Sequence, residues 1–596
     1  MTRLSTGAFA VLVAATIAAF FITQHLKVTT PLLAGTPRPV PGVIDPLHGV
    51  PCMQGRNSGS TTISFYLLHR ADTVDVFVVS NATGEIIRTV ATGRHMRKGV
   101  RNPDGVFHWD GREDNGQVAP DGTYYFRVAL IHQNRTIDLS SVPVKVKTVP
   151  PHPVVTRVTP SLIPGAHGTS VTIHYAGNEN RGGTVRIYRT DLPGDPLVKS
   201  FLTPWNGHTA IWDGKINGRP APAGTYLVGL DVSDAACDTG HFPARMPPAP
   251  GTTPNAGVTV SYLTAQAPLD PVPAGSDADV QVRSPGLAYH WALSRAGTRG
   301  PTASGESAQE ALSVHVPAGR PGLYKLALRS PAGTTTVPIV ASGAPRARVL
   351  VVLPALTWQG LNPVDDAGDG VPNTLANGGP INLDRPLVAG PPAGIADEAG
   401  LLEYLDASHR SYELTTDLGL ISGVGPRPAG HAAVVLAGSE RWLPSSEMAV
   451  LRSYARAGGR VLSLGVDSLR RGVTVAGNRA LNPTRPFATD ALGARLGGLA
   501  SKTAAPVTVT SDGLGLFTGV AAPLAGFRTY QPVLSVAAPG RIESSAAPSS
   551  GSPAIVGYGL GDGIVVDLGV PGFGGALSSD AAARQLIDQI WTVVSK

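Results

Sequence analysis

The chain carries one sequence frame twice, and this repeat limits the folds available to its N-terminal half. Residues 107–128 read FHWDGREDNGQVAPDGTYYFRV, and residues 210–232 read AIWDGKINGRPAPAGTYLVGLDV. The frame predicts a strand that ends in a large aromatic, a tight turn, and a new strand that begins with β-favouring side chains. Trp109 and Trp212 are 103 positions apart (212 − 109), which is the spacing expected of tandem β-sandwich domains.

Apolar residues alternate upstream of the frame, as Val74, Val76 and Val78 do in the first copy. This period of two is typical of half-buried strands. The arrangement resembles the Ig-like domain of the flagellar hook-capping protein, over about residues 58–148 and 155–240. The resemblance implies two Ig-like sandwiches and says almost nothing about activity.

A third β-region follows a proline-rich linker. Val280 and Val282 form one period-two pair, Val314 and Val316 form another, and Tyr324 follows a turn like that of the repeat. We therefore expect a third, diverged sandwich.

From residue 348 onward, continuous apolar runs alternate with helical segments. Such runs are typical of strands buried on both faces, and the alternation predicts an α/β domain with a doubly wound, parallel sheet. The strand runs include 348–353, 432–437, 460–464 and 564–568, and the helical segments are 396–407, 444–457 and 579–594.

Several motifs of this region resemble the C-terminal domain of the large subunit of N,N-dimethylformamidase. They are LPALTWQGLN at 353–362, Arg385-Pro386, AGSERW at 437–442 and AGGR at 457–460. The resemblance spans about residues 346–475. It implies a flavodoxin-like, class I glutamine-amidotransferase-like fold and an enzyme that hydrolyses a small amide at an iron ion held by two Tyr and one Glu.

The motifs depart from that family at the metal ligands. Trp358 and Leu361 stand where the family has tyrosines, whereas Glu440 is retained. Gly438 and Ser439 replace the His and Asp of the family motif. A ferric ion requires anionic oxygen ligands, so iron is not expected here.

Ligands of open α/β sheets bind beyond the carboxyl ends of the strands. Trp358, Asn362 and Trp442 are therefore the predicted residues of a ligand crevice. Ser439 is a candidate nucleophile with Glu440 beside it, and His409 and His431 are the nearest histidines in sequence. The alternative is that Glu440 and Trp442 pack against or cap the following helix.

An acidic, glycine-rich loop at 365–370 (DDAGDG) suggests a second kind of site. Asp365, Asp366 and Asp369 offer oxygens to a hard cation such as Ca²⁺. Ala367 occupies a ligand position, and Ala376 stands where calcium loops place a bidentate Glu. A solvated turn is the alternative, and no other cofactor is expected.

The N-terminus reads as a membrane anchor. Arg3 precedes an apolar run at 7–22, which Lys27 follows. The run lies between the length of a signal-peptide core and that of a full span. The bulky residues at its end favour an uncleaved, single-pass anchor over a cleaved signal peptide. Cys52 and Cys237 fit an oxidising exterior and are candidates for one disulfide between the first two sandwiches.

These features favour an extracytoplasmic envelope protein attached to the cell membrane by its N-terminal helix. The net charge is +6 and the arginines are scattered, so a nucleic-acid footprint is absent. We expect a binding or scaffold role towards a surface ligand or protein, with the amidase-like domain catalytically degenerate. The alternative is a surface hydrolase acting on a small amide, ester or glycan-derived substrate.

The predicted divisions are an anchor at 1–27, a proline-rich spacer at 28–57, sandwiches at 58–150 and 151–242, a linker at 243–257, a third sandwich at 258–345 and the α/β domain at 346–596.

Overall fold

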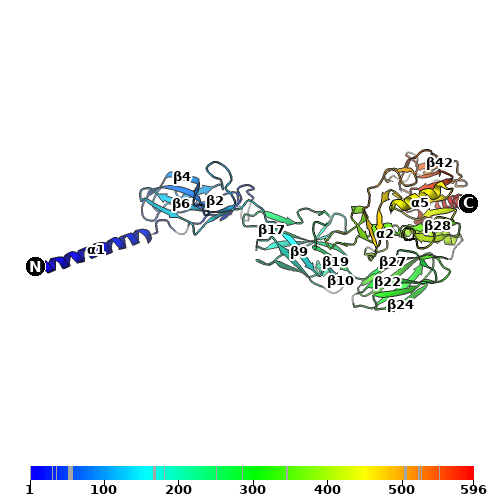
Figure 1. The fold of residues 1–596 in the computed structure, drawn as a ribbon, viewed down its shortest axis with the longest axis horizontal. Coiled ribbons are helices and arrows are strands. Elements are labelled where there is room, and N and C mark those ends of the chain that lie inside the picture. Colours follow the sequence, from blue (N-terminus) through cyan, green and yellow to red (C-terminus); the bar gives the residue numbers. More distant parts are fainter. Residues whose placement is uncertain are drawn as a thin grey trace.

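The computed structural model shows an elongated chain of modules (Figure 1). Helix α1 (Thr2–Thr29) lies at one end, two β-sandwiches follow it, and the third sandwich and the C-terminal domain lie together at the other end. The structure describes residues 2–29, 31–34, 37–50, 58–164, 169–179, 181–249, 251–284, 286–343, 347–388, 390–501, 507–520, 524, 527–548 and 551–596, with the side chains of α1 described over 7–23. Among the described residues, which for the side chains of α1 are 7–23 alone, no helix is long and apolar enough to cross a membrane.

The first sandwich packs a six-stranded sheet against a two-stranded one. Phe65, Phe107, Trp109 and Phe126 are fully or almost fully buried between them. The larger sheet has the order β1-β8-β6-β3-β4, with β7 paired to β6. Its strands are β1 (Val43–Ile44), β3 (Asp72–Ser80), β4 (Ile86–Met96), β6 (Gly122–Leu130), β7 (Arg135–Asp138) and β8 (Val144–Val146), and β2 (Thr61–Ser64) pairs with β5 (Val106–Trp109).

The proline-rich segment predicted as a spacer at 28–57 is part of this sandwich wherever the structure describes it. Strand β1 pairs in parallel with β8, and Leu33 and Val40 form bridges to Leu67 and Thr62. The prediction of a free spacer is therefore wrong for residues 31–34 and 37–50. Prolines lack a donor, which suits the segment to a sheet edge as much as to a linker.

The second sandwich has a six-stranded and a three-stranded sheet. The larger has the order β10-β19-β17-β12-β13, with β18 on β17; its strands are β10 (Leu162–Pro164), β12 (Gly183–Arg189), β13 (Leu197–Leu202), β17 (Gly224–Ser233), β18 (Thr239–Phe242) and β19 (Gly257–Ser261). The smaller contains β9 (Val154–Thr159), β11 (Val171–Ala176) and β14 (Thr209–Trp212), and β15 (Lys215–Ile216) and β16 (Arg219–Pro220) form a hairpin. Strand β19 pairs with β10 and β17, so the predicted boundary at 258 is wrong: this strand completes the second core through Val258 and Val260.

The third sandwich has a three-stranded sheet, β20-β22-β25, and a five-stranded sheet, β21-β27-β26-β23-β24. The strands are β20 (Thr264–Gln266), β21 (Val272–Pro273), β22 (Asp277–Arg283), β23 (Tyr289–Arg295), β24 (Ala303–Ser307), β25 (Ala311–His315), β26 (Gly322–Ser330) and β27 (Gly333–Ser342). Leu323 and Val340 belong to the same apolar core as Val351 of the next domain, so the two modules share buried surface.

The repeated frame adopts the same local structure in both copies. Each tryptophan ends a strand, is buried, and donates from its indole nitrogen to the carbonyl oxygen three residues later. Trp109 bonds Arg112 at 2.9 Å and Trp212 bonds Lys215 at 3.0 Å. The indole nitrogen is thereby satisfied inside an apolar core.

A tyrosine near the start of a strand has the same role in all three sandwiches. Its hydroxyl donates to the carbonyl oxygen four residues upstream, which pins the turn before the strand, as in the tyrosine corner of Ig folds. The three bonds run from Tyr124 to Pro120, from Tyr226 to Pro222 and from Tyr324 to Arg320, each at 2.7 Å.

The C-terminal domain is built on an eight-stranded sheet of order β30-β28-β31-β33-β44-β43-β42-β39. The first five strands are parallel and the last three antiparallel. The strands are β28 (Val349–Leu353), β30 (Glu413–Thr416), β31 (Ala433–Leu436), β33 (Arg460–Ser463), β39 (Val507–Asp512), β42 (Ile542–Pro548), β43 (Ile555–Leu560) and β44 (Gly563–Leu568).

Helices and short two- or three-stranded pieces surround this sheet. The helices are α2 (Ala355–Leu361), η1 (Leu375–Asn377), α3 (Ile395–Ala407), α4 (Asp417–Ser422), α5 (Ser445–Arg456), α6 (Phe573–Ala576) and α7 (Ala581–Val594). The short strands are β29 (Ile381–Asn382), β32 (Trp442–Leu443), β34 (Arg471–Gly472), β35 (Thr474–Ala476), β36 (Arg479–Leu481), β37 (Ala494–Leu496), β38 (Ala500–Ser501), β40 (Thr529–Tyr530) and β41 (Val533–Val536).

The two faces of the sheet bury different side chains of the same strands. On one face Val351 packs in a core with Leu401 of α3 and Ile590 of α7. On the other, Val352 packs in a core with Leu451 of α5. Because consecutive strand residues point to opposite faces, helices on both sides account for the unbroken apolar runs of these strands.

Candidate functional site

A crevice lies where the winding of the parallel sheet reverses. Strand β28 comes first in the chain, β30 lies on one side of it and β31 on the other. Connections from the two central strands therefore leave in opposite directions, and the gap at their carboxyl ends is where such sheets bind ligands. A cavity of about 200 Å³ occupies this place; it is lined by Pro354 after β28, by Gly438 and Ser439 after β31, and by Gly465 after β33.

Helix α2 presents one face to the crevice and the opposite face to the core. Thr357 and Leu361, one helical turn apart, line the cavity, whereas Trp358 is buried in the core. The Thr357 hydroxyl also accepts a 3.0 Å hydrogen bond from the Arg441 N–H. This bond joins α2 to the segment after β31, and Arg441 lines the cavity as well.

Glu398, in the first turn of α3, is the most distinctive side chain of the crevice. It lines the cavity although the residue is only 2 % exposed. Burial raises its pKa to about 8, and the charge of Asp397 adds to this effect. The Trp358 indole N–H approaches the carboxyl group and opposes the shift slightly, but it does not reach hydrogen-bond geometry. Among the described residues Glu398 Oε2 has no hydrogen-bond partner. At neutral pH this residue is a neutral acid with a proton to donate.

The carboxyl group of Glu398 fills the space beside Gly438. A Cβ atom added at Gly438 would lie 2.1 Å from Glu398 Oε1, and one at Gly465 would lie 2.3 Å from the Gly438 carbonyl oxygen. No side chain fits at either position without displacing its neighbour. Gly438 thus lies against a carboxyl group from α3.

Glu440 and Asp417 form a buried acid pair behind the crevice. Asp417 accepts bonds from the Leu356 N–H at 3.0 Å and the Leu418 N–H at 2.7 Å. Burial raises its pKa to about 7, although these bonds and its contact with Glu440 favour the ionised form. Burial and the Asp417 charge raise the pKa of Glu440 well above its usual value. No N–H or hydroxyl group of the described structure donates to Glu440. Two acids buried side by side in this way favour a shared state in which the pair is not fully ionised.

The structure does not assemble a Ser-His pair from the residues predicted for it. Ser439 Oγ accepts a 3.2 Å bond from the Val466 N–H. His431 precedes β31, at the opposite end of the strand from Ser439, and its Nε2 lies 3.2 Å from Glu413 Oε2. His409 follows the carboxyl end of α3, whereas the amino end of that helix lines the crevice. Of the candidate nucleophile Ser439 and its neighbour Glu440, only Ser439 lines the cavity.

Trp358, Asn362 and Trp442 do not line the crevice, contrary to expectation. Trp358 and Trp442 are core residues, because α2 lies against the sheet and directs one face inward. Asn362 is buried and donates to Gln359 Oε1 at 3.0 Å and to the Pro386 carbonyl at 2.8 Å. It ties the end of α2 to the segment after Arg385.

Arg385 has a structural role at the same end of α2. Its guanidinium donates to the carbonyl oxygens of Gln359 at 2.6 Å and Asn362 at 2.9 Å, where the helix dipole favours a positive charge. It also pairs with Asp366 Oδ2 at 3.0 Å. The conspicuous Arg-Pro motif therefore fixes α2 and the acidic loop.

The carboxylates of the loop at 365–370 are occupied by the protein itself. Asp365 accepts from the Gly368 N–H at 2.7 Å and the Gly370 N–H at 2.8 Å, and burial raises its pKa to about 6. Asp366 pairs with Arg385. Asp369 accepts from the Val371 N–H at 2.9 Å and from the Gly251 N–H at 2.7 Å. The loop at 365–370 is thus folded around its own carboxylates.

This loop fastens the second sandwich to the C-terminal domain. Thr190 Oγ1 donates to the Gly370 carbonyl at 2.6 Å, and Thr253 Oγ1 donates to the Asp369 carbonyl at 2.6 Å. The Gly257 N–H donates to the Gly368 carbonyl at 3.0 Å. Glycine is needed at position 370, where φ is +77° and a Cβ would meet Leu227 at 2.8 Å.

Sequence reasoning did not identify Glu398 or Asp417. Both are acidic residues in the first turn of a helix, a common place for a charge that complements the helix dipole. The signal that distinguishes them is position: Asp417 directly follows β30, and α3 lies between β28 and β30 in sequence. First-turn acids next to the carboxyl ends of parallel strands are candidates for the crevice.

Cys237 is disulfide-bonded. Cys52, the other cysteine of the chain, lies outside the described residues.

Comparison with known proteins supports the N-terminal part of this architecture. The family model of the FlgD Ig-like domain matches residues 53–133, which confirms the resemblance seen in the first copy of the repeat. No curated protein sequence matches the chain.

Solved structures with similar modules include the FN1–FN3 domains of chicken CNTN1 (11 % identity, TM-score 0.16, 48 % of this chain and 94 % of that chain). Others are domains MG0-NIE-MG1 of Escherichia coli alpha-2-macroglobulin (12 %, 0.16, 47 % and 92 %) and the exo-beta-1,4-mannosidase Op5Man5 from Opitutaceae bacterium strain TAV5 (13 %, 0.24, 42 % and 36 %). The chain thus spans about a third of the mannosidase. Likenesses at these TM-scores carry no argument about function.

Proposed function

We propose that this chain is a membrane-anchored, extracytoplasmic scaffold protein whose Ig-like sandwiches hold a ligand-binding α/β domain away from the membrane. The observation that carries the proposal is the linear order of the modules: α1 lies at one end and the C-terminal domain at the other (Figure 1). In such an arrangement, the sandwiches act as spacers and the distal domain is free to meet a ligand or protein partner.

The side chains of α1 support the anchoring part of the proposal. Phe9, Phe20 and Phe21 are 58–69 % exposed, so the described part of the helix leaves its apolar side chains uncovered by the rest of the chain. Large apolar surface left uncovered marks an interaction with a membrane or a protein. We assign α1 to the cell membrane as a single-pass anchor.

The topology supports assigning the C-terminal domain to the doubly wound α/β class. Its parallel strands follow one another in the order second, first, third, fourth, fifth, which is the order of flavodoxin-like folds. Two of the segments that resemble dimethylformamidase, 353–362 and 437–442, contribute residues to this crevice. We propose that the domain descends from an amidase-like ancestor and has lost the iron chemistry.

The crevice is suited to a small, polar, uncharged ligand. Its volume of about 200 Å³ is below the range of roughly 300–1,000 Å³ that is usual for drug-sized ligands. The neutral Glu398 acid and the Ser439 hydroxyl supply donors, and Leu361 supplies an apolar wall. A carbonyl compound of a few heavy atoms, such as a small amide, fits this set of groups.

A binding assay tests this role directly. Ligand-observed NMR against a panel of small amides, esters and sugar fragments should find binders of the full-length protein. Glu398→Ala should weaken their binding by about two- to twelvefold, the equivalent of the roughly 0.5–1.5 kcal/mol of a hydrogen bond between neutral groups. Glu403→Ala, on the same helix, serves as the control. Binding that is unchanged in Glu398→Ala would contradict the assignment of the crevice.

A surface hydrolase is the second candidate, because Glu398 titrates near 8 beside Ser439 in the crevice. A general acid is most effective when its pKa lies near the working pH. Turnover of a small amide or ester that is lost in Glu398→Gln and in Ser439→Ala would favour this candidate. Turnover lost in Glu440→Ala, together with stoichiometric iron in the purified protein, would instead restore the family's chemistry.

We also propose that Cys52 is the partner of Cys237 in a disulfide between the first two sandwiches. Mass spectrometry of peptides from a non-reducing digest should find the two cysteine peptides linked. Two separate alkylated peptides would contradict the pairing.

A further inference from the structure

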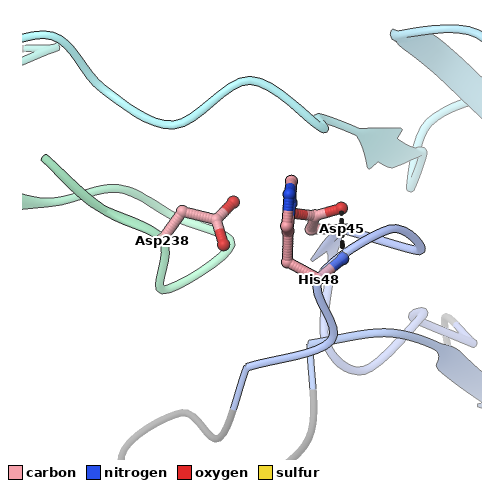
Figure 2. A group of neighbouring side chains, drawn as sticks. All are labelled: Asp45, His48 and Asp238. Atoms are coloured by element: carbon pink, nitrogen blue, oxygen red, sulfur yellow. Dashed lines mark hydrogen bonds and ion pairs between the residues drawn. The ribbon is translucent and has the colours of Figure 1, made fainter.

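Three potential metal ligands from two different sandwiches converge at the first inter-sandwich junction. Asp45 and His48 lie in the loop after β1 of the first sandwich, and Asp238 lies between β17 and β18 of the second. One ligand atom of each lies within 4.8 Å of the others. Figure 2 shows the Asp238 carboxylate directed across the junction towards His48 and Asp45.

One carboxylate oxygen at the junction has no hydrogen-bond partner among the described residues. Asp238 is 3 % exposed, and no group of the described part of the chain donates to its Oδ2. A buried carboxylate oxygen without a donor is costly and calls for a cation or a proton. The unpaired Oδ2 atom of Asp238 faces the imidazole of His48 and the carboxylate of Asp45. This arrangement indicates a ligand-binding site at the junction of the two sandwiches.

Asp45 is held in position for the same role. Its Oδ1 accepts from the Leu47 N–H at 2.8 Å and the His48 N–H at 3.2 Å, and its Oδ2 lies 2.6 Å from His48 Nδ1. The backbone bonds fix the carboxylate, and the contact with the ring fixes the imidazole. Outer contacts of this kind orient metal ligands.

The charges of the cluster also favour a cation. Asp45 and Asp238 are both buried, and their carboxylates lie within 4.8 Å of each other. Two carboxylates that face each other in a buried junction are stabilised together when a divalent ion lies between them.

We propose that Asp45, His48 and Asp238 form a three-ligand site for a divalent transition-metal ion that clamps the first sandwich to the second. One imidazole and two carboxylates are a mixed nitrogen and oxygen set, which suits Zn²⁺ or Mn²⁺ better than Ca²⁺. Because the ligands come from both sandwiches, the metal stabilises the junction and reduces the freedom of the two modules to move apart.

The test uses the full-length protein in detergent, without a histidine tag, with its disulfide intact, and after treatment with and removal of a chelator. Titration with Zn²⁺ should show one bound equivalent. Asp238→Asn and His48→Gln should each raise the dissociation constant at least about tenfold, since loss of an outer-shell partner alone costs that much. Ca²⁺ at the same concentration should not compete.

The Asp72–His132 pair of the first sandwich supplies a matched control. His132 Nδ1 lies 2.9 Å from Asp72 Oδ1, and the two side chains are as unequally exposed as those of His48 and Asp45. Among the described residues this pair has no third ligand within metal-binding distance. His132→Gln should therefore leave Zn²⁺ affinity unchanged.

A second readout keeps the proposal testable if one variant is unstable. Zn²⁺ should raise the melting temperature of the wild-type protein and of His132→Gln, and should not raise that of His48→Gln. Absence of stoichiometric Zn²⁺ or Mn²⁺ binding in the wild type would overturn the proposal. So would equal affinity in the wild type and both ligand variants.

Discussion

Lys147, just after the last strand of the first sandwich, pairs with Glu179 of the second sandwich at 3.0 Å. The same ammonium group donates to Asp234, whose side chain is fully buried. Asp234 also accepts from the Ala236 N–H at 2.9 Å and the Asp238 N–H at 3.0 Å. The first two sandwiches are therefore joined by ion pairs between their side chains as well as by the linker.

Removing this cation should loosen the junction. Lys147→Ala leaves the buried Asp234 without its charged donor, which costs about 1.5–3 kcal/mol of junction stability. Limited proteolysis should then cut faster between residues 148 and 153, and small-angle scattering should show a broader range of particle lengths. Lys145→Ala, at an exposed position of β8, is the control. Equal cleavage rates in Lys147→Ala and wild type would show that the contact does not hold the modules.

The shared geometry of the tyrosine corners predicts similar energetic effects in the three sandwiches. Phenylalanine at Tyr124, Tyr226 or Tyr324 removes one hydroxyl donor and leaves a carbonyl oxygen without its partner, at a cost of about 1 kcal/mol each. Denaturant unfolding monitored by a reporter in each sandwich measures this. Tyr125→Phe is the control, because the Tyr125 hydroxyl only accepts from Arg127, which keeps its pair with Asp138.

The buried acids of the crevice predict a pH dependence with a definite sign. Glu398 has a pKa of about 8 in the folded protein against an ordinary value of 4.5. Between these values the folded state holds a proton that the unfolded state has released. Stability therefore falls as pH rises from about 4.5 to 8.

Substitution of Glu398 by Gln should flatten this dependence, because a neutral amide replaces a neutral acid and no longer releases a proton. The slope should decrease without vanishing, since the pKa of Asp417, about 7, acts in the same direction. Melting temperatures of the C-terminal domain from pH 5 to 9 check this, with Glu403→Gln as control. A slope that is equal in Glu398→Gln and wild type would rule out the buried-acid interpretation.

The acidic loop should respond to mutation and not to calcium. Asp369→Ala removes the acceptor of the Gly251 and Val371 N–H groups, and two lost bonds to a charged group cost about 2 kcal/mol or more. The second sandwich should then detach more readily, which faster proteolysis at 251–256 would report. Asp384→Ala, at an exposed position, should change little. A rise in melting temperature on adding Ca²⁺ that Asp369→Ala abolishes would restore the calcium hypothesis.

The sequence predicts the sandwiches well because their determinants are local. The Trp-Asp-Gly frame and the tyrosine that follows carry both the turn and the buried aromatic, so Trp109 and Trp212 mark equivalent positions in the two copies. Local sequence patterns predict strands near the edges of the sheets less well than the central ones. Strand β19 and the segment around β1 are short and pair with partners distant in sequence. The segment around β1 is also rich in proline, a feature that linkers share.

The crevice is harder to predict because its chemistry depends on which helix faces which strand end. The order of segments predicts where the crevice lies, and Ser439 lines it. The inward turn of Trp358 and the approach of Glu398 to Gly438 depend on how α2 and α3 pack. The sequence resemblance draws attention to Glu440, but this side chain is buried next to Asp417 and does not line the crevice.

Topology in the cell tests the central claim most directly. Fusions of alkaline phosphatase, which is active only outside the cytoplasm, after residue 150, after residue 343 and at the C-terminus should all be active and should sediment with membranes. Replacement of the apolar run at 7–22 by a polar sequence should abolish both properties. Inactive fusions with the protein in the soluble cytosolic fraction would contradict the account.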